Sequence, residues 1–194
     1  MAPSGAGKTT LLKLISGIER PDSGIIEGGP LRAGMVFQED RLCERYNVIM
    51  NIMLTTAGSR ISETESSTAG SGRSPGIGKS VVGKKADDIM KIMKEALCLL
   101  PESCLDKPVN ELSGGMKRRC AILRAMLSCS EIIIMDEPFN GLDEENRRKA
   151  ALYILERLNG RTLIITTHRD EDIELFNKLC PDIRKEMLVF SKRL

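Results

Sequence analysis

Residues 111–143 read ELSGGMKRRCAILRAMLSCSEIIIMDEPFNGLD, and this stretch decides the fold. Its run of four apolar residues, 132–135, is short and rich in isoleucine, which predicts a strand buried on both faces. Two carboxylates, Asp136 and Glu137, follow this strand, and then comes Pro138, which does not continue a central strand. Acidic side chains at the carboxyl end of a buried parallel strand occupy the place where α/β folds bind their ligands.

A glycine turn lies upstream of that strand. Residues 112–115, LSGG, carry little side-chain bulk and expose backbone N–H groups just before a predicted helix, a geometry that suits a bound anion. An anion-binding turn followed by a metal-binding acid is the outline of nucleotide hydrolysis. The sequence therefore favours an α/β enzyme acting on a phosphorylated ligand.

Another glycine turn opens the chain; in chain order it is the first glycine turn, and the turn at 112–115 is the second. Residues 2–9 read APSGAGKT and match the phosphate-binding pattern GxxxxGK[ST] except at its first glycine, where Ala2 stands. In that pattern the backbone N–H groups face the phosphates, Lys8 reaches the β- and γ-phosphates, and the Thr9 hydroxyl binds Mg²⁺. The alternative is an ordinary glycine turn before a helix, and the motifs further along the chain favour the phosphate site.

Length and composition limit the alternatives. A chain of 194 residues is long enough for one α/β domain with a small helical lobe. The net charge of +2, with acids and bases interspersed, gives no basic surface for nucleic acid. Six cysteines without a CxxC pair predict reduced thiols in a cytosolic protein. Since no apolar run approaches the roughly 20 residues that span a bilayer, we expect any membrane role to depend on a partner.

Three motifs in this order carry a family resemblance. LSGGM, IIIMDEP and GLD resemble the signature motif, the Walker B motif and the D-loop of the ABC-type ATPases, the nucleotide-binding subunits of membrane transporters. The resemblance implies a single α/β P-loop NTPase domain over residues 1–194, with a mostly parallel sheet flanked by helices. Its core would comprise residues 1–39 and 128–194, and a helical lobe would comprise 40–127.

Composition changes sharply within the expected lobe. Residues 55–85 are rich in serine, glycine and threonine and nearly free of large apolar side chains, so they bury too little surface to offset the entropy of ordering. We expect a flexible insertion there. Further strands are predicted at 35–37, 162–166 and 187–190, and the helix after the first glycine turn is predicted to place Leu11, Ile15 and Ile18 on the core.

The resemblance also implies the site residues. Gln38 follows a strand and matches the Q-loop, Glu137 would polarise the attacking water, and His168, the single histidine of the chain, matches the switch histidine that binds the γ-phosphate. The metal ligands would be Thr9, Gln38 and Asp136. The ATP-binding residues are those of the first glycine turn and the start of its helix: Ser4, Gly5, Ala6, Gly7, Lys8, Thr9 and Thr10. The implied cofactors are ATP and Mg²⁺.

Family members act as dimers. Ser113, Gly114 and Gly115 would bind the γ-phosphate held by a second ATPase subunit, in our interpretation an identical copy, and Asp143 of the D-loop would contact that subunit. Two simpler roles are compatible with these: Ser113 and Asp143 are both suited to cap the helices that follow them. The basic run of residues 117–119 is predicted to be a solvated helix face.

The resemblance further implies partners and a location. A transmembrane permease would bind the ATPase, a solute-binding protein would act indirectly, and nucleic acid would not take part, so the chain would lie peripherally at the cytoplasmic face of the cell membrane. The sequence segments VFQEDRLCE and DEPFNGLDEENR most resemble the ATPases of bacterial importers for nitrate, sulfonate, taurine and related anions. A soluble ABC-type ATPase acting on DNA or ribosomes is an open alternative.

The amino terminus departs from the family pattern. A P-loop follows a buried parallel strand, and the family has further strands upstream, whereas only Met1 precedes this turn. We therefore expect a sheet without its N-terminal strands, from an N-terminally truncated chain. A truncated and catalytically impaired remnant of an ABC ATPase is the second open alternative.

Overall fold

The computed structural model describes residues 7–28, 31–57 and 86–181. The chain forms two compact units: one holds the described parts of Met1–Arg41 and Ser130–Leu194, and the other holds those of Leu42–Cys129. The first unit is an α/β unit built around a sheet, and the second is helical. We describe each by itself.

The sheet of the α/β unit has three parallel strands among the described residues. They are β1 (Ala33–Val36), β2 (Ile132–Asp136) and β3 (Thr162–Thr166), with β2 in the middle. All five residues of β2 are buried, which confirms the prediction from its apolar run. β3 is half-exposed along most of its length, because β2 is its single neighbour in the described sheet. The first strand begins and ends earlier than the predicted 35–37.

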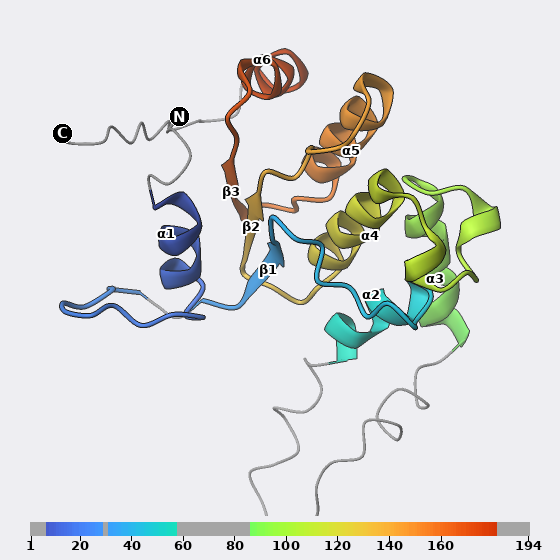
Figure 1. The fold of residues 1–194 in the computed structure, drawn as a ribbon, viewed down its shortest axis with the longest axis horizontal. Helices are drawn as coiled ribbons and strands as arrows, with labels where there is room; N and C mark the ends of the chain where they lie inside the picture. Colours follow the sequence, from blue (N-terminus) through green and yellow to red (C-terminus); the bar gives the residue numbers. More distant parts are fainter. Residues whose placement is uncertain (1–6, 29–30, 58–85, 182–194) are drawn as a thin grey trace, which may run out of the picture. The chain divides into compact units, whose positions relative to one another are not determined.

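Helix α1 (Lys8–Ile15) covers one face of this sheet (Figure 1). Its buried Leu12 packs with Ile132 and Ile134 of β2, and the half-buried Ile15 joins them. The predicted core face was therefore wrong in part: Leu12, not Leu11, is the buried leucine, and Ile18 is 51% exposed because the helix has ended before it.

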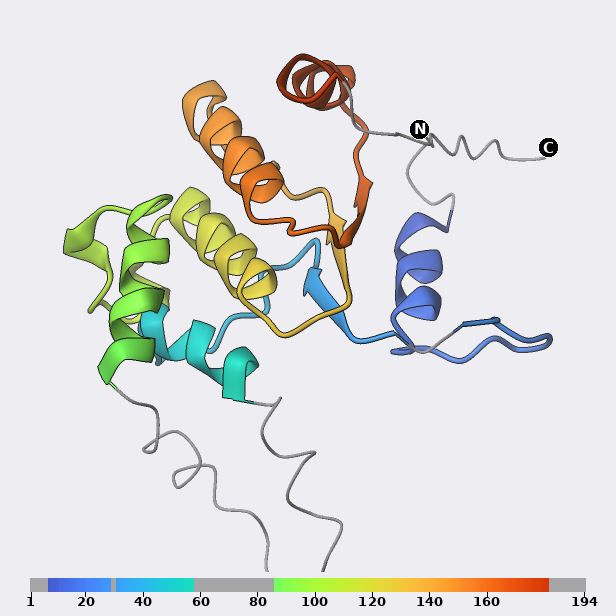
Figure 2. The ribbon, with the colours of Figure 1, turned by 180° about the vertical axis from the view of Figure 1, so that it is seen from behind.

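Helices α5 (Glu144–Glu156) and α6 (Asp170–Leu179) lie on the side of the sheet away from α1 (Figures 1 and 2). The buried side of α5 includes Ala150, Tyr153 and Ile154, and its small alanine allows close packing. An aromatic pair, Phe139 and Phe176, joins the turn after β2 to α6 with ring centroids 5.8 Å apart. The α/β fold class is thus confirmed.

The helical unit contains α2 (Val48–Ala57), α3 (Ala86–Leu97) and α4 (Gly114–Met126), which pack on one another. Two short 3₁₀ turns, η2 (Glu102–Cys104) and η3 (Val109–Glu111), connect α3 to α4. Fully buried apolar residues come from all three helices and include Ile52, Ala96 and Cys120.

Buried polar side chains organise the segments that enter this unit. The amide of Asn51, fully buried, accepts from the Cys43 N–H at 2.8 Å and donates to the carbonyls of Cys43, Tyr46 and Asn47. A buried amide that satisfies four backbone partners fixes the approach to α2 in one conformation.

The prediction of a solvated basic face over residues 117–119 was wrong. Arg118 is 6% exposed, and Arg119 is half-buried. Arg119 donates to the Leu99 carbonyl at 2.6 Å and to the Gly115 carbonyl at 3.2 Å, so it joins the start of α4 to the chain just after α3. The long apolar stem of arginine allows such burial when the guanidinium finds acceptors.

Two sequence predictions, the insertion at 55–85 and the strand at 187–190, fall partly or wholly outside the described residues. The insertion was expected from residue 55, yet α2 continues through Ala57, and the hydroxyls of Thr55 and Thr56 bond to carbonyls three residues back. The rest of that stretch, 58–85, and the predicted strand 187–190 lie outside the described residues.

Candidate nucleotide-binding site

The predicted site residues of the α/β unit gather at the carboxyl edge of its sheet. Because the three strands are parallel, their ends meet at one edge, and each end carries a predicted residue. Gln38 lies two residues beyond β1, Asp136 ends β2 with Glu137 next to it, and His168 lies two residues beyond β3. Gln38 and His168 are exposed there, whereas Asp136 is buried.

Asp136 is held by two hydroxyl groups. Its Oδ2 accepts from Thr9 Oγ1 on α1 at 2.6 Å, and its Oδ1 accepts from Thr166 Oγ1 on β3. The first contact joins two residues that are far apart in the sequence: Thr9, at the end of the first glycine turn, and Asp136, at the end of the buried strand β2. Two charge-assisted hydrogen bonds satisfy a carboxylate that is 5% exposed.

Glu137 has a left-handed backbone, with φ of 50°. Its N–H donates to the Thr166 carbonyl at 3.0 Å and, in a longer contact of 3.3 Å, to the Thr166 hydroxyl. This fixes the turn that follows β2. The Glu137 side chain is 18% exposed, and its Oε1 lies 3.2 Å from His168 Nδ1, so two of the three predicted catalytic side chains, Glu137 and His168 but not Gln38, are in contact here.

The first glycine turn is described from Gly7 onward. Gly7 precedes α1 with φ of 84°, a conformation that glycine adopts at no steric cost, and its carbonyl accepts from the Leu11 N–H. The first turn of α1, from Lys8, has backbone N–H groups without partners inside the helix, which favours an anion. Lys8 is half-buried, Thr10 is exposed, and Ser4, Gly5 and Ala6 lie outside the described residues.

The second glycine turn lies in the helical unit. Ser113 precedes α4, and its hydroxyl accepts from the Met116 N–H at 3.3 Å, so the prediction that Ser113 caps this helix is confirmed. Gly114 and Gly115 form the first turn. These three residues are not in the unit that holds Asp136.

Asp143 caps α5, as predicted. Its Oδ1 accepts from the Asn146 N–H, and its Oδ2 accepts from the Asn146 side-chain amide, both at 2.8 Å. A contact with a second subunit stays a prediction for both Asp143 and the Ser113 turn.

Thr166 is a site residue that the sequence analysis missed. It is the register partner of Asp136, and its hydroxyl and carbonyl contact both Asp136 and Glu137. A threonine at the end of an apolar strand is an ordinary β-branched residue by pattern. The signal that could have identified it is the pairing of two strands of equal length whose last residues are an acid and a hydroxyl.

The residues at this edge fit a magnesium ion. Mg²⁺ prefers oxygen ligands and, in nucleotide sites, takes one or two from the protein and the rest from phosphate and water. The Thr9 hydroxyl and the Asp136 carboxylate are such oxygens and are already in contact. In the part of the chain that the structure describes, no cluster of three or more His, Cys, Asp or Glu side chains forms a protein-only metal cage, and such a cage is not needed here.

A parallel sheet with a glycine turn, a buried aspartate and a neighbouring glutamate at its carboxyl edge defines a P-loop nucleoside-triphosphatase fold. The family model of the ABC transporter matches residues 1–140. The chain belongs to the ABC transporter family.

Two relatives illustrate the breadth of this family. The chain is 32% identical over 197 residues to the Nod factor export ATP-binding protein I of Cupriavidus metallidurans, a match that covers 93% of this chain and 56% of that protein. It is 30% identical over 188 residues to the taurine import ATP-binding protein of Jannaschia sp., covering 92% of this chain and 62% of that protein. The chain thus spans about three-fifths of the length of these relatives.

A solved structure agrees with the fold. A dimeric ATP-binding cassette in a post-hydrolysis state, bound to ADP and phosphate, superposes with a TM-score of 0.65 at 25% identity, over 90% of this chain and 75% of that one. Within residues 7–28, 31–57 and 86–181, no helix is both long and apolar enough to cross a membrane.

Proposed function

We propose that this chain binds and hydrolyses ATP as the nucleotide-binding subunit of an ABC transporter. The observation that carries the proposal is a cluster of four side chains at one sheet edge: Thr9, Asp136, Glu137 and His168. The Thr9 hydroxyl bonds to the Asp136 carboxylate, and the His168 imidazole contacts the Glu137 carboxylate. ATP hydrolysis needs a phosphate cradle, a metal-binding oxygen pair and a group that orients water. This cluster supplies candidates for the oxygen pair and the water-orienting group, and the first turn of α1 is the candidate cradle.

Each residue has a definable role. The first turn of α1 and Lys8 would hold the phosphates, while Thr9 and Asp136 would hold Mg²⁺ through oxygen. When bound, Mg²⁺ neutralises charge on the phosphate oxygens. Glu137 would accept a hydrogen bond from the attacking water and align it, and His168, in contact with Glu137 Oε1, would fix the carboxylate and face the γ-phosphate.

Transport requires partners. We propose a homodimer in which the Ser113 turn of one subunit completes the phosphate site of the other, a permease that contacts the helical unit, and a solute-binding protein that delivers the cargo. Resemblance to a taurine importer supports import of nitrate, sulfonate, taurine or a similar anion. The Nod factor export relatives make direction the first property to test.

Hydrolysis is tested by substitution of Glu137. The purified chain should release phosphate from ATP in a Mg²⁺-dependent manner, and Glu137→Gln should lower kcat by about 10²–10⁴ while it retains ATP binding. Binding is measured separately by thermal unfolding, where ATP at about 100 times its Kd should stabilise the fold by about 2.7 kcal/mol. Glu156→Gln, an exposed position on α5, is the matched control.

Two outcomes oppose the proposal. Unchanged hydrolysis in Glu137→Gln contradicts the assignment of Glu137. ATP binding without hydrolysis in the parent chain supports an impaired remnant instead.

Direction and cargo need a cellular measurement. Deletion of the gene should reduce uptake of labelled taurine, an alkanesulfonate or nitrate by the cells that encode it, and the gene on a plasmid should restore uptake. The Glu137→Gln variant on the same plasmid should not. Normal uptake of all three anions together with a defect in export of another compound contradicts the proposed import.

A further inference from the structure

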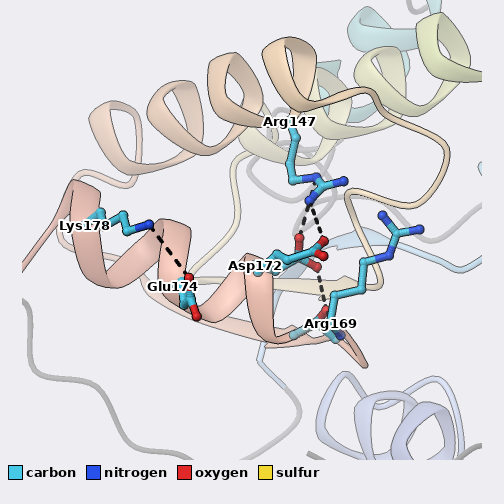
Figure 3. Close-up of polar contacts among 7 residues, drawn as sticks. Arg147, Arg169, Asp172, Glu174 and Lys178 are labelled. Carbon is cyan, nitrogen blue, oxygen red and sulfur yellow. Dashed lines mark hydrogen bonds and ion pairs between the residues drawn. The ribbon is translucent and has the colours of Figure 1, made fainter.

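The first turn of α6 contains a buried carboxylate that the proposed mechanism does not use. Asp172 is 4% exposed, and a charge so far from water requires partners. Its Oδ2 accepts from Thr167 Oγ1 at 2.5 Å, and its Oδ1 faces Arg147 Nε of α5 at 3.8 Å (Figure 3). In the described part of the chain neither Oδ1 nor Nε has a hydrogen bond, so the Arg147 contact is one of charge alone.

Thr167 connects this carboxylate to the segment that carries His168. The same Thr167 hydroxyl that donates to Asp172 accepts from the Arg169 N–H at 3.1 Å. The residues on both sides of His168 are therefore held through one hydroxyl, and that hydroxyl is oriented by Asp172. The His168 side chain is 54% exposed, so little packing surrounds it, and the backbone of this segment sets where the imidazole meets Glu137.

Arg147 connects the first turn of α6 to α5. Its side chain is 14% exposed, and Nη1 also bonds to Glu171 Oε2 at 3.1 Å. Arg147 lies one turn after Asp143, whose carbonyl accepts from the Arg147 N–H at 2.9 Å. The start of α5, capped by Asp143, therefore contacts the start of α6 directly.

We infer that Asp172, acting through Thr167 and neutralised by Arg147, is a positioning residue that sets His168 against Glu137. Asp172 and Arg147 touch neither His168 nor Glu137 in the described contacts; they fix the backbone on which His168 is carried. The inference rests on the proposed function in one respect, since positioning of His168 affects a rate only if His168 acts in hydrolysis.

The test combines kinetics with a signal from His168. Because the chain has one histidine, its imidazole ¹H–¹⁵N resonances are assigned without ambiguity. Thr167→Val removes the hydroxyl, and Thr167→Ser retains it. We expect Thr167→Val to shift the His168 resonances and to lower kcat by about tenfold to a hundredfold with KM for ATP within about twofold, and Thr167→Ser to restore both.

Further variants examine the two charged residues. Arg147→Met keeps an unbranched apolar stem and removes the guanidinium with its charge, and Asp172→Ala removes the acceptor. Both should shift the His168 resonances in the direction of Thr167→Val. Glu174→Gln is the matched control, because Glu174 lies on the same helix, is exposed and pairs with Lys178 (Figure 3). If Asp172→Ala does not fold, the two Thr167 variants decide.

The outcomes separate this inference from the proposed function. Wild-type His168 resonances and wild-type kcat in Thr167→Val overturn the inference while hydrolysis stands. A parent chain without hydrolysis overturns the proposed function, yet a His168 shift confined to Thr167→Val, Arg147→Met and Asp172→Ala still supports the positioning role. Equal shifts in the Glu174→Gln control overturn it.

Discussion

Asp136 and Thr166 are register partners at the ends of β2 and β3, and the Thr166 hydroxyl donates a hydrogen bond to the Asp136 carboxylate. The bond crosses from one strand to the next at the edge where the site lies. The backbone ladder aligns the two residues, and the side-chain bond then fixes the carboxylate within that alignment. The sheet thus fixes one oxygen of the Asp136 carboxylate, and the Thr9 hydroxyl on α1 fixes the other.

Removal of this hydroxyl should destabilise the fold. Thr166→Val is nearly isosteric but leaves one oxygen of a buried carboxylate with one partner fewer, which costs about 1–3 kcal/mol. Urea unfolding of both proteins measures the difference. Thr162→Val, at the exposed start of the same strand, should change stability by no more than about 0.5 kcal/mol. Equal effects of the two substitutions would contradict the role given to the hydroxyl.

Arg119 should be important for the stability of the helical unit. Arg119→Ala removes two hydrogen bonds from a charged donor to the Gly115 and Leu99 carbonyls, and we expect a loss of about 1.5–3 kcal/mol. Lys117→Ala, half-buried on the same helix, is the control and should cost far less. Chemical unfolding followed by circular dichroism measures both, and a neutral result for Arg119→Ala would show that water replaces these contacts.

The two helix caps predict a specific order of effects. Ser113→Ala and Asp143→Ala should each lower stability by about 1 kcal/mol, because each leaves an N–H in the first turn unbonded. Glycine at either position should lower stability by only about a few tenths of a kcal/mol, since glycine is itself a tolerated cap. Thermal unfolding of the four variants tests the order, and an alanine that is no worse than glycine would mean that the caps contribute nothing.

Glu131 makes a pH-dependent contribution to the stability of the fold. The hydrogen bond from the Arg32 N–H lowers the pKa of Glu131, and the Arg32 guanidinium adds to this effect. A carboxyl with a lowered folded-state pKa stabilises the fold above its unfolded-state pKa of about 4.3, and this stabilisation disappears as pH falls through the folded-state pKa. The Tm of Glu131→Gln should therefore lie below that of the parent near neutral pH and converge with it in acid.

The control for this prediction is Glu156→Gln, which removes an exposed carboxylate from α5. Its Tm difference from the parent should not follow the same pH course. A constant difference between Glu131→Gln and the parent across the acidic range would contradict the lowered pKa as its cause.

Much of this architecture follows from local pattern. The apolar run before Asp136 predicted the central strand, and Ser113 and Asp143 were recognisable as caps because a short side-chain oxygen before a helix has one favourable bond to make. Glu137 and His168 were named from the family resemblance, and the parallel strand ends, which bring distant residues to one edge, explain why the structure places them in contact.

Other features depend on tertiary contacts that periodicity does not contain. Arg118 and Arg119 were predicted to be solvated because charged residues usually are, yet one is buried and the other bonds to a carbonyl 20 residues away. Asp172 is one of three acids in the first turn of α6, a position that helix electrostatics alone explains. Only the fold shows that Asp172 faces Arg147.

The left-handed backbone of Glu137 means that the residue best suited to the stability of this position differs from the residue that the proposed mechanism needs. A side chain in this conformation costs about 1–2 kcal/mol relative to one in an ordinary region, and glycine or asparagine would relieve that strain. A screen for thermal stability alone would thus favour variants that have lost the carboxylate. If Glu137 has the role proposed above, a more robust form of this protein has to be engineered with residue 137 excluded from substitution, because its most stabilising replacements would also remove the proposed catalytic carboxylate.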